Sequence, residues 1–366
     1  MCFAFLLVAL LSLSVASSAE EPDLKLEVVR LWSSSVTNPH EVAGIHSRGG
    51  GRFLSGGSTY SRETGESHWW GEIDAKGKRV RRGENWDRRG YRDSKIVSVL
   101  PAGDDTWVVG ERTLTRFDKE GKAKFSRSIF KLSPIERYSL GFSSAVTTRD
   151  GGLVLVGLSQ KSRGSMDGWI VRVDANGQLV WEKDVNLGNE DWFLHVLPMA
   201  AKGKERYVTV GVSGKANKFG SGFSRSVVVS FSGDGTKLRE RSFSGSLSPN
   251  QQSVATLSDG RVLLAYSKSQ FPTRDAWLAC MDSNLRILWD QQIGKAQVTA
   301  YSPCVGTNRH GQAIVTWNAA RGNTVWRVDL QQGERLASKT FPDTRAFFVG
   351  GIFRVLLFSL FIFTSL

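Results

Sequence analysis

Short apolar segments alternate with polar, glycine-containing turns along most of the chain, and residues 25–340 contain no long segment with the 3.6-residue period of an amphipathic helix. The clearest unit runs from Asp150 to Val185. It starts with an apolar run at Leu153–Leu158, continues through a polar loop to a strand with alternating apolar residues, and reaches the turn pair Asn176-Gly177. Asn-Gly favours tight hairpin turns because both residues tolerate positive φ. The pattern predicts short antiparallel β-strands.

The same unit recurs six times, with a mean spacing of about 51 residues between successive turns. An apolar residue precedes the first residue of each turn. The turn-start residues are Asp74, Asp118, Asp174, Ser232, Asp282 and Asp329. Each unit also has an earlier strand, at Arg52–Gly56, Trp107–Gly110, Leu153–Gly157, Tyr207–Gly211, Arg261–Ala265 and Ala313–Trp317. Four short strands in about 50 residues, separated by turn signals, are typical of a β-propeller blade.

We therefore predict an all-β fold, a single β-propeller domain within residues 25–345 that has six four-stranded blades. Seven blades are the less favoured alternative, because the C-terminal tail has too few residues to build another. The segment Lys25–Ser34 resembles the outermost strand of a blade. We expect it to complete the last blade and close the ring, which would remove an exposed sheet edge.

The order of the repeated unit is Asp-Gly-Gly before an apolar strand, then Asp-x-Trp, then Asp-x-x-Gly-x-x-x-Trp. It resembles the repeats of bacterial exported β-propeller proteins, the group described as quinoprotein-like or delta-60-type. The resemblance covers about residues 40–340 and is closest in the third and fifth units. The second unit lacks both Trp residues, and Leu285 replaces the turn Gly of the fifth. The resemblance implies a propeller and an exported location, but no function, because propellers have many.

The two ends differ from the repeats. Residues 1–19 form an apolar run that ends in small residues, which is typical of a secretory signal peptide cut after Ala19; an uncleaved anchor is the alternative. Residues 346–366 form a hydrophobic C-terminal tail that contains Arg354. The tail fits a membrane anchor, a lipid-anchor signal or an extension packed on the domain edge. We therefore expect a secreted, periplasmic or cell-surface protein that the tail could hold at a membrane.

Charge and composition narrow the partners. The 366 residues include 48 Lys and Arg against 35 Asp and Glu, a net charge of +13, which favours anionic partners. The 38 Gly and 12 Trp residues fit the turns and the contacts between blades. Beyond the leader, the chain keeps Cys280 and Cys304, which either pair or remain buried thiols.

Motifs for catalysis are weak. The Asp-x-x-Gly-x-x-x-Trp pattern resembles the turns of quinone-dependent dehydrogenases, but no adjacent Cys pair accompanies it, so we interpret the Trp residues as packing between blades. The turn aspartates resemble those of sialidase-like propellers, but the Val-Asp-x-x-Gly order differs from the Ser-x-Asp-x-Gly box. We interpret them as turn formers. No two His residues have metal-ligand spacing, and we expect no cofactor and no metal.

The remaining candidate site is the face where the loops entering each blade meet those joining its two middle strands. These loops are rich in cations and aromatic residues. The candidate binding residues are Arg62, Arg88, Arg92, Arg137, Arg163, Lys218, Arg274, Trp86, Tyr91, Tyr138 and Trp192. Arg binds carboxylate and sulfate, and flat rings stack on sugars. The sequence thus predicts a binding or scaffold module for an anionic polysaccharide or protein, with no nucleic acid as partner.

The alternative is a hydrolase or lyase that acts on an acidic polysaccharide at the channel mouth. Such an enzyme needs two carboxyl groups, or a carboxylate with a Tyr or His, about 5–9 Å apart near the axis. A binding module needs only the cations and aromatic rings. Acidic residues clustered at the channel mouth beside several Arg residues would argue against binding alone. The sequence assigns no such pair, so it favours the binding module over an enzyme.

Overall fold

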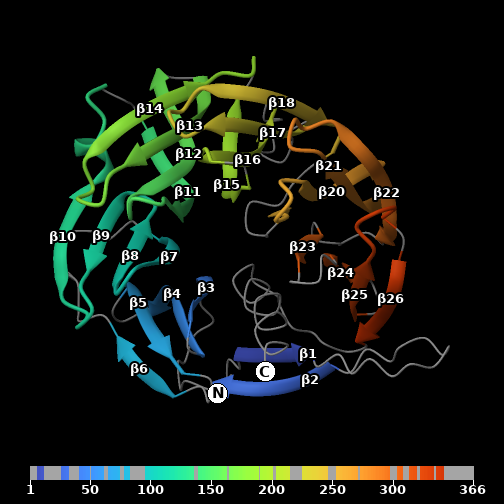
Figure 1. The fold of residues 1–366 in the computed structure, drawn as a ribbon, viewed down its shortest axis with the longest axis horizontal. Helices are drawn as coiled ribbons and strands as arrows, with labels where there is room; N and C mark the ends of the chain where they lie inside the picture. Colours follow the sequence, from blue (N-terminus) through green and yellow to red (C-terminus); the bar gives the residue numbers. More distant parts are fainter. Residues whose placement is uncertain are drawn as a thin grey trace.

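The computed structural model describes residues 6–11, 26–32, 41–49, 51–61, 65–74, 78–82, 95–135, 139–162, 165–188, 190–200, 203–214, 225–245, 253–270, 273–296, 303–307, 313–319, 322–333 and 335–341. Within these ranges, six four-stranded antiparallel sheets stand around a ring (Figure 1). This arrangement is a β-propeller and confirms the predicted fold class. In the described part of the chain, no helix has the length and apolar character needed to cross a bilayer.

Each blade uses four strands that follow one another in the sequence. The first blade contains β3 (Glu41–Gly49), β4 (Arg52–Ser61), β5 (Gly65–Ile73) and β6 (Arg79–Arg82). The second contains β7 (Ile96–Ala102), β8 (Asp105–Gly110), β9 (Thr113–Phe117) and β10 (Ala123–Ser128). The third contains β11 (Ser139–Thr147), β12 (Leu153–Ser162), β13 (Ser165–Val173) and β14 (Leu179–Val185).

The remaining blades repeat this order. The fourth contains β15 (Asp191–Met199), β16 (Arg206–Ser213), β17 (Arg225–Ser232) and β18 (Lys237–Phe243). The fifth contains β19 (Val254–Thr256), β20 (Val262–Gln270), β21 (Thr273–Met281) and β22 (Ile287–Ala296). The sixth contains β23 (Cys304–Thr307), β24 (Ala313–Ala319), β25 (Gly322–Val328) and β26 (Arg335–Phe341). The earlier strand expected in each unit is the second strand of its blade.

The N-terminal strand differs from its expected place. β2 (Leu26–Trp32) pairs with β1 (Leu6–Leu11) in a separate two-stranded sheet, which Figure 1 shows between the first and sixth blades. The sixth blade takes its fourth strand, β26, from its own segment, so the expected contribution of Lys25–Ser34 is not needed to complete it. β1 falls within the predicted signal peptide, whose cleavage stays a prediction, and the tail 346–366 lies outside the described residues.

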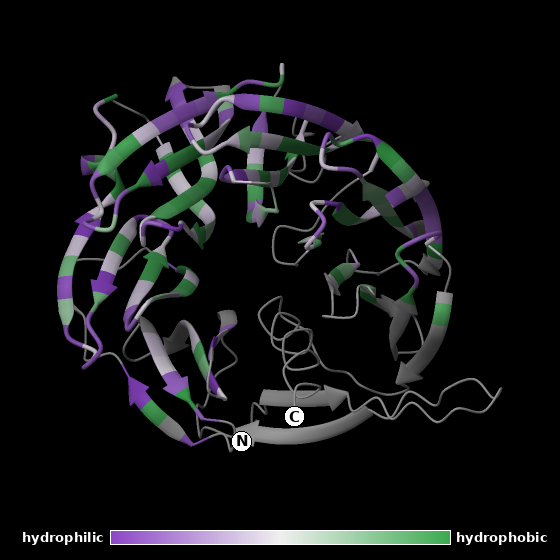
Figure 2. Cartoon of the chain, viewed as in Figure 1, coloured by the Kyte–Doolittle hydropathy of each residue, from purple (hydrophilic) through white to green (hydrophobic). Residues whose placement is uncertain are grey.

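The apolar core lies between neighbouring blades. Every residue of β8 and nearly every residue of β16 is buried, whereas the outermost strand β18 is mostly exposed. Figure 2 shows the same gradient, with mostly hydrophobic middle strands and mainly hydrophilic outer strands. One cluster joins Leu100 and Trp107 of the second blade to Leu153 and Trp169 of the third. Comparable clusters join each later pair up to the sixth blade, so hydrophobic burial holds neighbouring blades together.

Serines link the innermost strands of three successive blades. The Ser98 hydroxyl of β7 accepts a hydrogen bond from the Ala145 amide of β11 at 3.3 Å. The Ser144 hydroxyl of β11 accepts one from the Val196 amide of β15 at 3.4 Å. Each serine follows an irregularity in the strand register. Such bulges twist a strand locally and free backbone groups for new partners.

The turn aspartates act as the sequence predicts. Asp174 Oδ1 accepts the amides of Asn176 and Gln178, both at 2.8 Å, and Asp118 and Asp282 repeat this pair of bonds in their own turns. These bonds fix the turn between the third and fourth strands. The interpretation as turn formers is confirmed, and the turns need no catalytic explanation.

Leu285 stands where the matching turns have Gly, and its φ is 60°. This conformation is uncommon for a residue with a Cβ, which crowds the following carbonyl. The Leu285 side chain is 2% exposed and packs in the cluster between the fourth and fifth blades. Burial of the side chain offsets the backbone cost in this one turn.

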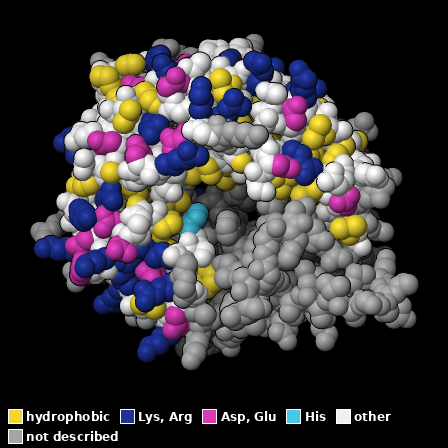
Figure 3. Space-filling view, viewed as in Figure 1, with side chains coloured by type: hydrophobic (Ala, Val, Ile, Leu, Met, Phe, Trp, Pro, Cys, Tyr) yellow, Lys and Arg dark blue, Asp and Glu magenta, His cyan; other side chains and the backbone are white. Residues whose placement is uncertain are grey.

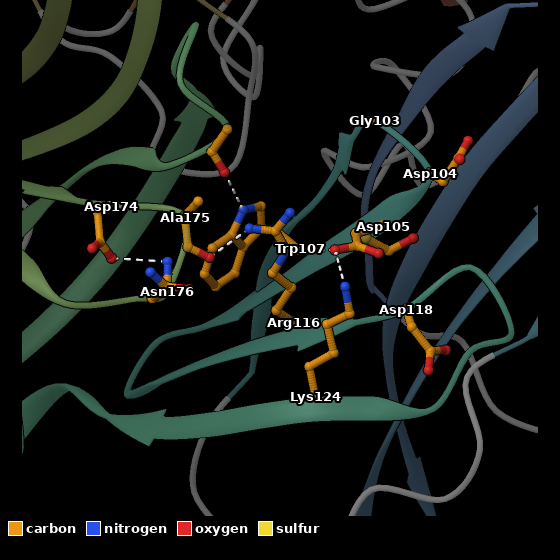
Figure 4. A network of polar contacts seen from close by, with 12 residues as sticks. Gly103, Asp104, Asp105, Trp107, Arg116, Asp118, Lys124, Asp174, Ala175 and Asn176 are labelled. Atoms are coloured by element: carbon orange, nitrogen blue, oxygen red, sulfur yellow. Dashed lines mark hydrogen bonds and ion pairs between the residues drawn. The ribbon is translucent and has the colours of Figure 1, made fainter.

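Arg side chains of the second and third blades hydrogen-bond to the turns of the next blade. Arg116 of β9 donates to the Ala175 carbonyl in the third blade, while Trp107 donates to the Gly151 carbonyl at 3.1 Å (Figure 4). Arg172 of β13 repeats the contact one blade on and donates to the Gly233 carbonyl at 2.9 Å. Arg116 and Arg172, which alternate with apolar residues along their strands, thus face the next blade instead of solvent.

Cys280 and Cys304 form no disulfide. Both are buried thiols, as in the second of the two outcomes expected from the sequence. Burial raises the pKa of the Cys280 thiol to about 11. The thiolate needed for reaction is therefore scarce at neutral pH, so Cys280 acts as an apolar core residue.

Candidate interaction surface

The blade topology separates two ends of the propeller. Because the four strands of each blade are antiparallel and consecutive, the turns after the first and third strands lie at one end, which we call the turn end. The connections between second and third strands, and those between blades, lie at the other, which we call the loop end. The predicted binding face is the loop end.

Most of the predicted binding residues lie outside the described part of the chain. These residues are Arg62, Arg88, Arg92, Arg137, Arg163, Lys218, Trp86, Tyr91 and Tyr138. Arg274 lies in β21, where its backbone pairs with Ser269 and Ala296. The basic and aromatic binding face therefore stays a prediction for this set.

Trp192 is described in full. It lies near the start of β15, is partly buried, and packs against the cluster between the fourth and fifth blades. Its indole N–H donates to the Ser143 hydroxyl of the third blade at 2.6 Å. Its described contacts thus join blades to one another.

The connector from Ile129 to Ile135, between the second and third blades, exposes apolar side chains at the loop end. Phe130 is 49% exposed and Ile135 is 44% exposed. Lys131 lies between them and is exposed, as is Arg112, whose carbonyl accepts the Ile129 amide at 2.9 Å. This segment, the connector 129–135, places an exposed aromatic ring beside cations, which is the combination predicted for the loop end.

Contacts with the core and with β14 anchor the connector 129–135. Ile129 and Leu132 are buried in the cluster between the second and third blades. The Ser133 hydroxyl donates to Glu182 Oε1 of β14 at 2.9 Å, and the Ile135 amide lies 3.2 Å from the same hydroxyl. Buried apolar anchors and a hydrogen-bonded turn hold the exposed side chains outward.

A polar network occupies the loop end between the third and fourth blades. Asp191, the first residue of the innermost strand β15, is fully buried and accepts the Leu187 amide at 2.7 Å. Arg225 Nη2 donates to the Leu187 carbonyl at 2.8 Å, and Asn186 donates to Asp167 Oδ1 at 2.9 Å. The network braces the connection between the two blades.

Burial raises the pKa of Asp191, and the nearby charge of Asp167 raises it further. Hydrogen bonds from Ser213 and the Leu187 amide, together with the Arg225 charge, oppose this increase. A pair of neighbouring carboxyl groups is the arrangement that glycoside hydrolysis uses. Among the described residues, no group of three or more His, Cys, Asp or Glu side chains could hold a metal ion.

We expect Asp191→Asn to raise the melting temperature at pH 7, with a difference that shrinks towards pH 3. A carboxyl whose pKa rises on folding adds stability below its ordinary pKa and loses it as pH rises through the raised value. Asn removes the buried charge and keeps an acceptor for the Leu187 amide. Thermal unfolding from pH 3 to pH 8 measures the effect.

Asp234→Asn is the matched control. The Ser232 hydroxyl and the Thr236 amide lower the pKa of this exposed carboxyl to about 2. Its stabilising bonds are present at neutral pH and are lost as pH falls through that value, so Asp234→Asn should lower the melting temperature at pH 7. If Asp191→Asn behaves like this control, Asp191 is stabilised as a carboxylate and our interpretation is wrong.

The aromatic residues Tyr266 and Trp277 of the fifth blade contact charged side chains of the same blade. The Tyr266 hydroxyl donates to Asp290 at 2.9 Å, and burial raises the pKa of Tyr266. Lys268 Nζ lies 3.3 Å from Asp290 Oδ2 and 3.2 Å from the centre of the Trp277 ring. The cation covers this ring, so the ring face is engaged in a cation–π contact within the blade.

Cations are abundant beyond these clusters. Figure 3 shows Lys and Arg side chains gathered on the side of the ring that carries the first and second blades, with Asp and Glu among them. Sequence reasoning selected cations in the loops and counted Asp191 among the acidic loop residues without giving it a role, but it missed Phe130 and Ile135. The available signal was the segment Phe-Lys-Leu-Ser-Pro-Ile, in which apolar residues interrupt a turn sequence without strand alternation.

Comparison with known proteins is informative about the fold. No protein-family model and no curated protein matches the chain. Among solved structures, the Dos1 propeller has a TM-score of 0.54 at 9% identity and covers 86% of this chain and 75% of its own. A candidate 6-phosphogluconolactonase from Bacteroides uniformis has 0.53 at 10%, covering 92% and 99%. The WD40 domain of Neurospora crassa Pan2 has 0.51 at 13%, covering 81% and 77%. At these identities, the similarity is evidence for the β-propeller fold alone.

Proposed function

We propose that this chain is an exported β-propeller binding or scaffold module, of the quinoprotein-like repeat type, that engages an anionic polysaccharide or protein through its loop end. The observation that carries the proposal is the connector 129–135, where the exposed Phe130 lies beside the exposed Lys131. The net charge of +13 and the Arg-rich loops point to the same class of partner. The predicted leader supports a secreted, periplasmic or cell-surface location, with the tail as a possible membrane anchor.

The test measures binding of the full chain to heparin, to alginate and to polyglutamate. We expect Arg88→Glu combined with Arg92→Glu to weaken binding about tenfold, because charge reversal adds repulsion to the lost attraction. Lys119→Glu with Lys122→Glu makes the same charge change at the turn end, where both side chains are exposed. This control should bind like the unmodified chain.

Two results would contradict the proposal. Equal weakening by the loop-end and turn-end variants would show that the total charge, rather than a surface, governs binding. Binding that persists unchanged at about 0.5 M salt would remove the electrostatic explanation, because the Debye length is already about 10 Å at 0.1 M.

The second candidate is a hydrolase or lyase that acts on an acidic polysaccharide at the channel mouth. Its support is the interacting pair Asp167 and Asp191. Asp191 is fully buried, and its carboxyl accepts a hydrogen bond from the Leu187 amide. A carboxyl in this position does not face a substrate, which favours the binding module. Release of new sugar ends from alginate by the unmodified chain, abolished in Asp191→Asn, would reverse this preference.

A further inference from the structure

Six large apolar side chains are exposed in the described part of the chain. They are Val80, Phe130, Ile135, Val180, Leu288 and Leu336. Four of them lie on the outermost strands of four different blades and are therefore spread around the ring. Phe130 and Ile135 lie in one connector at the loop end. Isolated exposed Val or Leu residues are ordinary on protein surfaces, but a pair in one loop requires an explanation.

The connector 129–135 could bury these side chains only by breaking its own anchors. Ile129 and Leu132 already face the core, and Ser133 is bonded to Glu182. Phe130 and Ile135 are therefore held outward before any partner arrives. Side chains held in a binding geometry lose less conformational entropy on binding.

Cations flank the apolar pair. Lys131 is exposed between Phe130 and Ile135. Arg112, whose carbonyl accepts a hydrogen bond from the Ile129 amide, is also exposed. Among the described carboxylates near this surface, Glu182 is occupied by Ser133 and by the Trp169 indole, which donates to it at 3.0 Å, and Glu111 interacts electrostatically with Lys95. The described side chains of this surface thus combine apolar groups with positive charge.

We propose that the connector 129–135 docks the propeller on an anionic bilayer. Phe130 and Ile135 insert into the boundary between headgroups and acyl chains, and Lys131 and Arg112 contact the headgroups. Shallow insertion of apolar side chains beside cations is how interfacial elements bind anionic lipid. The proposal goes beyond a polysaccharide or protein partner, because it depends on the apolar side chains.

The exposed side chains of Phe130 and Ile135 favour a bilayer over a polysaccharide or a protein as the partner of this connector. An aliphatic Ile135 has no ring to stack on a sugar, so an acidic polysaccharide leaves its exposure unexplained. A stable protein interface buries about 800 Å² on each partner, so a protein partner would have to engage the neighbouring loops together with these two side chains. A bilayer needs no matching surface and takes up each side chain separately.

The test places an environment-sensitive fluorophore in the full chain at Ile135→Cys. Cys2 is replaced by Ser, and the buried Cys280 and Cys304 are shielded from the label. Vesicles of phosphatidylcholine are compared with vesicles that contain about 30% phosphatidylserine, a choice that supplies the anionic surface potential. We expect a blue shift and protection from iodide quenching with the anionic vesicles only. The same label at Leu288→Cys, a site on an outer strand that is 53% exposed against 44% for Ile135, should not respond.

Vesicle sedimentation provides the second measurement. Phe130→Ser with Lys131→Glu should lower the partition coefficient about tenfold or more, since both the insertion and the attraction are lost. Leu288→Ser with Lys122→Glu also replaces a large exposed apolar residue with Ser and reverses one Lys charge, but elsewhere on the ring, and should partition like the unmodified chain.

Any of three results overturns the inference. A label at position 135 that shifts with neither vesicle excludes bilayer contact and leaves a protein partner as the explanation. Equal shifts at positions 135 and 288 indicate adhesion without a docking surface. Equal response to both vesicle types removes the role of the cations. Heparin binding by Phe130→Ser with Lys131→Glu is measured in parallel, so that loss of lipid binding alone is distinguished from failure of the proposed polysaccharide function.

Discussion

Replacing Trp169 with Ala is expected to lower the free energy of unfolding by about 3–5 kcal/mol, because the side chain leaves a large cavity between two blades. The Trp169 side chain is fully buried. Its ring stacks on Phe142 at a centroid distance of 5.0 Å and an interplanar angle of 1°. Its indole N–H donates a hydrogen bond to Glu182, which also accepts one from the Ser133 hydroxyl of the connector 129–135. The substitution therefore removes apolar burial, stacking and a charged hydrogen bond together.

Urea unfolding followed by circular dichroism measures this loss. Trp169→Phe keeps a ring for Phe142 and loses only the indole bond and part of the volume, so it should fall between the native chain and the Ala variant. Val180→Ala on β14 is the exposed control, since Val180 is 53% exposed, and should change stability by no more than about 0.5 kcal/mol. A Trp169→Ala loss as small as this control would show that the ring does not hold the two blades.

The repeated blade could be predicted because its signals are local. Alternating apolar residues give the strands, and each turn contains its own hydrogen-bonding side chain, as Asp174 does for Asn176 and Gln178. Even the exceptional turn at Leu285 keeps the spacing, because burial of its side chain offsets the strained backbone. The local pattern could not place the N-terminal strand, since pairing between β1 and β2 depends on which distant edge is available.

The contacts between blades could not be predicted from the same pattern. Glu72, Arg116 and Arg172 occupy one repeat position, two residues before the turn Asp, where alternation suggests a solvent-facing side chain. In the structure this position faces the next blade. Arg116 and Arg172 donate to backbone carbonyls there. A backbone acceptor leaves no mark in the sequence, so the residue type alone does not reveal the contact.

The candidate surface shows the same division. Sequence reasoning predicted cations and aromatic rings in the loops, and the connector 129–135 has both. It could not show which apolar loop residues point outward: Ile129 and Phe130 are adjacent, yet Ile129 is fully buried and Phe130 is half exposed. That difference arises from packing against the core between the second and third blades, which only the fold specifies.

Glu72 supplies the counter-charge for three arginines of the first blade, two of which contact the second blade. Its side chain is 3% exposed and forms ion pairs with Arg81 at 2.8 Å and with Arg48 and Arg52 at 3.5 Å. Arg48 also donates to the Gly103 carbonyl of the second blade at 2.9 Å, and Arg81 donates to the Lys119 carbonyl. Burial, and next the Arg81 charge, lower the pKa of Arg48, so its cation is already poorly solvated.

Glu72→Ala is therefore expected to lower the free energy of unfolding by about 3–5 kcal/mol, because two partly buried guanidinium groups lose their counter-charge. Glu72→Gln should lose less, since its amide oxygen still accepts a bond from Arg81. Glu240→Ala, which breaks a more exposed pair with Lys237 at 3.2 Å, is the control and should lose at most about 1 kcal/mol. Removing Arg81 as well should recover part of the Glu72→Ala loss in a double-mutant cycle, because one of the uncompensated charges is then absent. Strictly additive losses would mean that Glu72 and Arg81 are not coupled and that Arg81 contacts the second blade independently of Glu72.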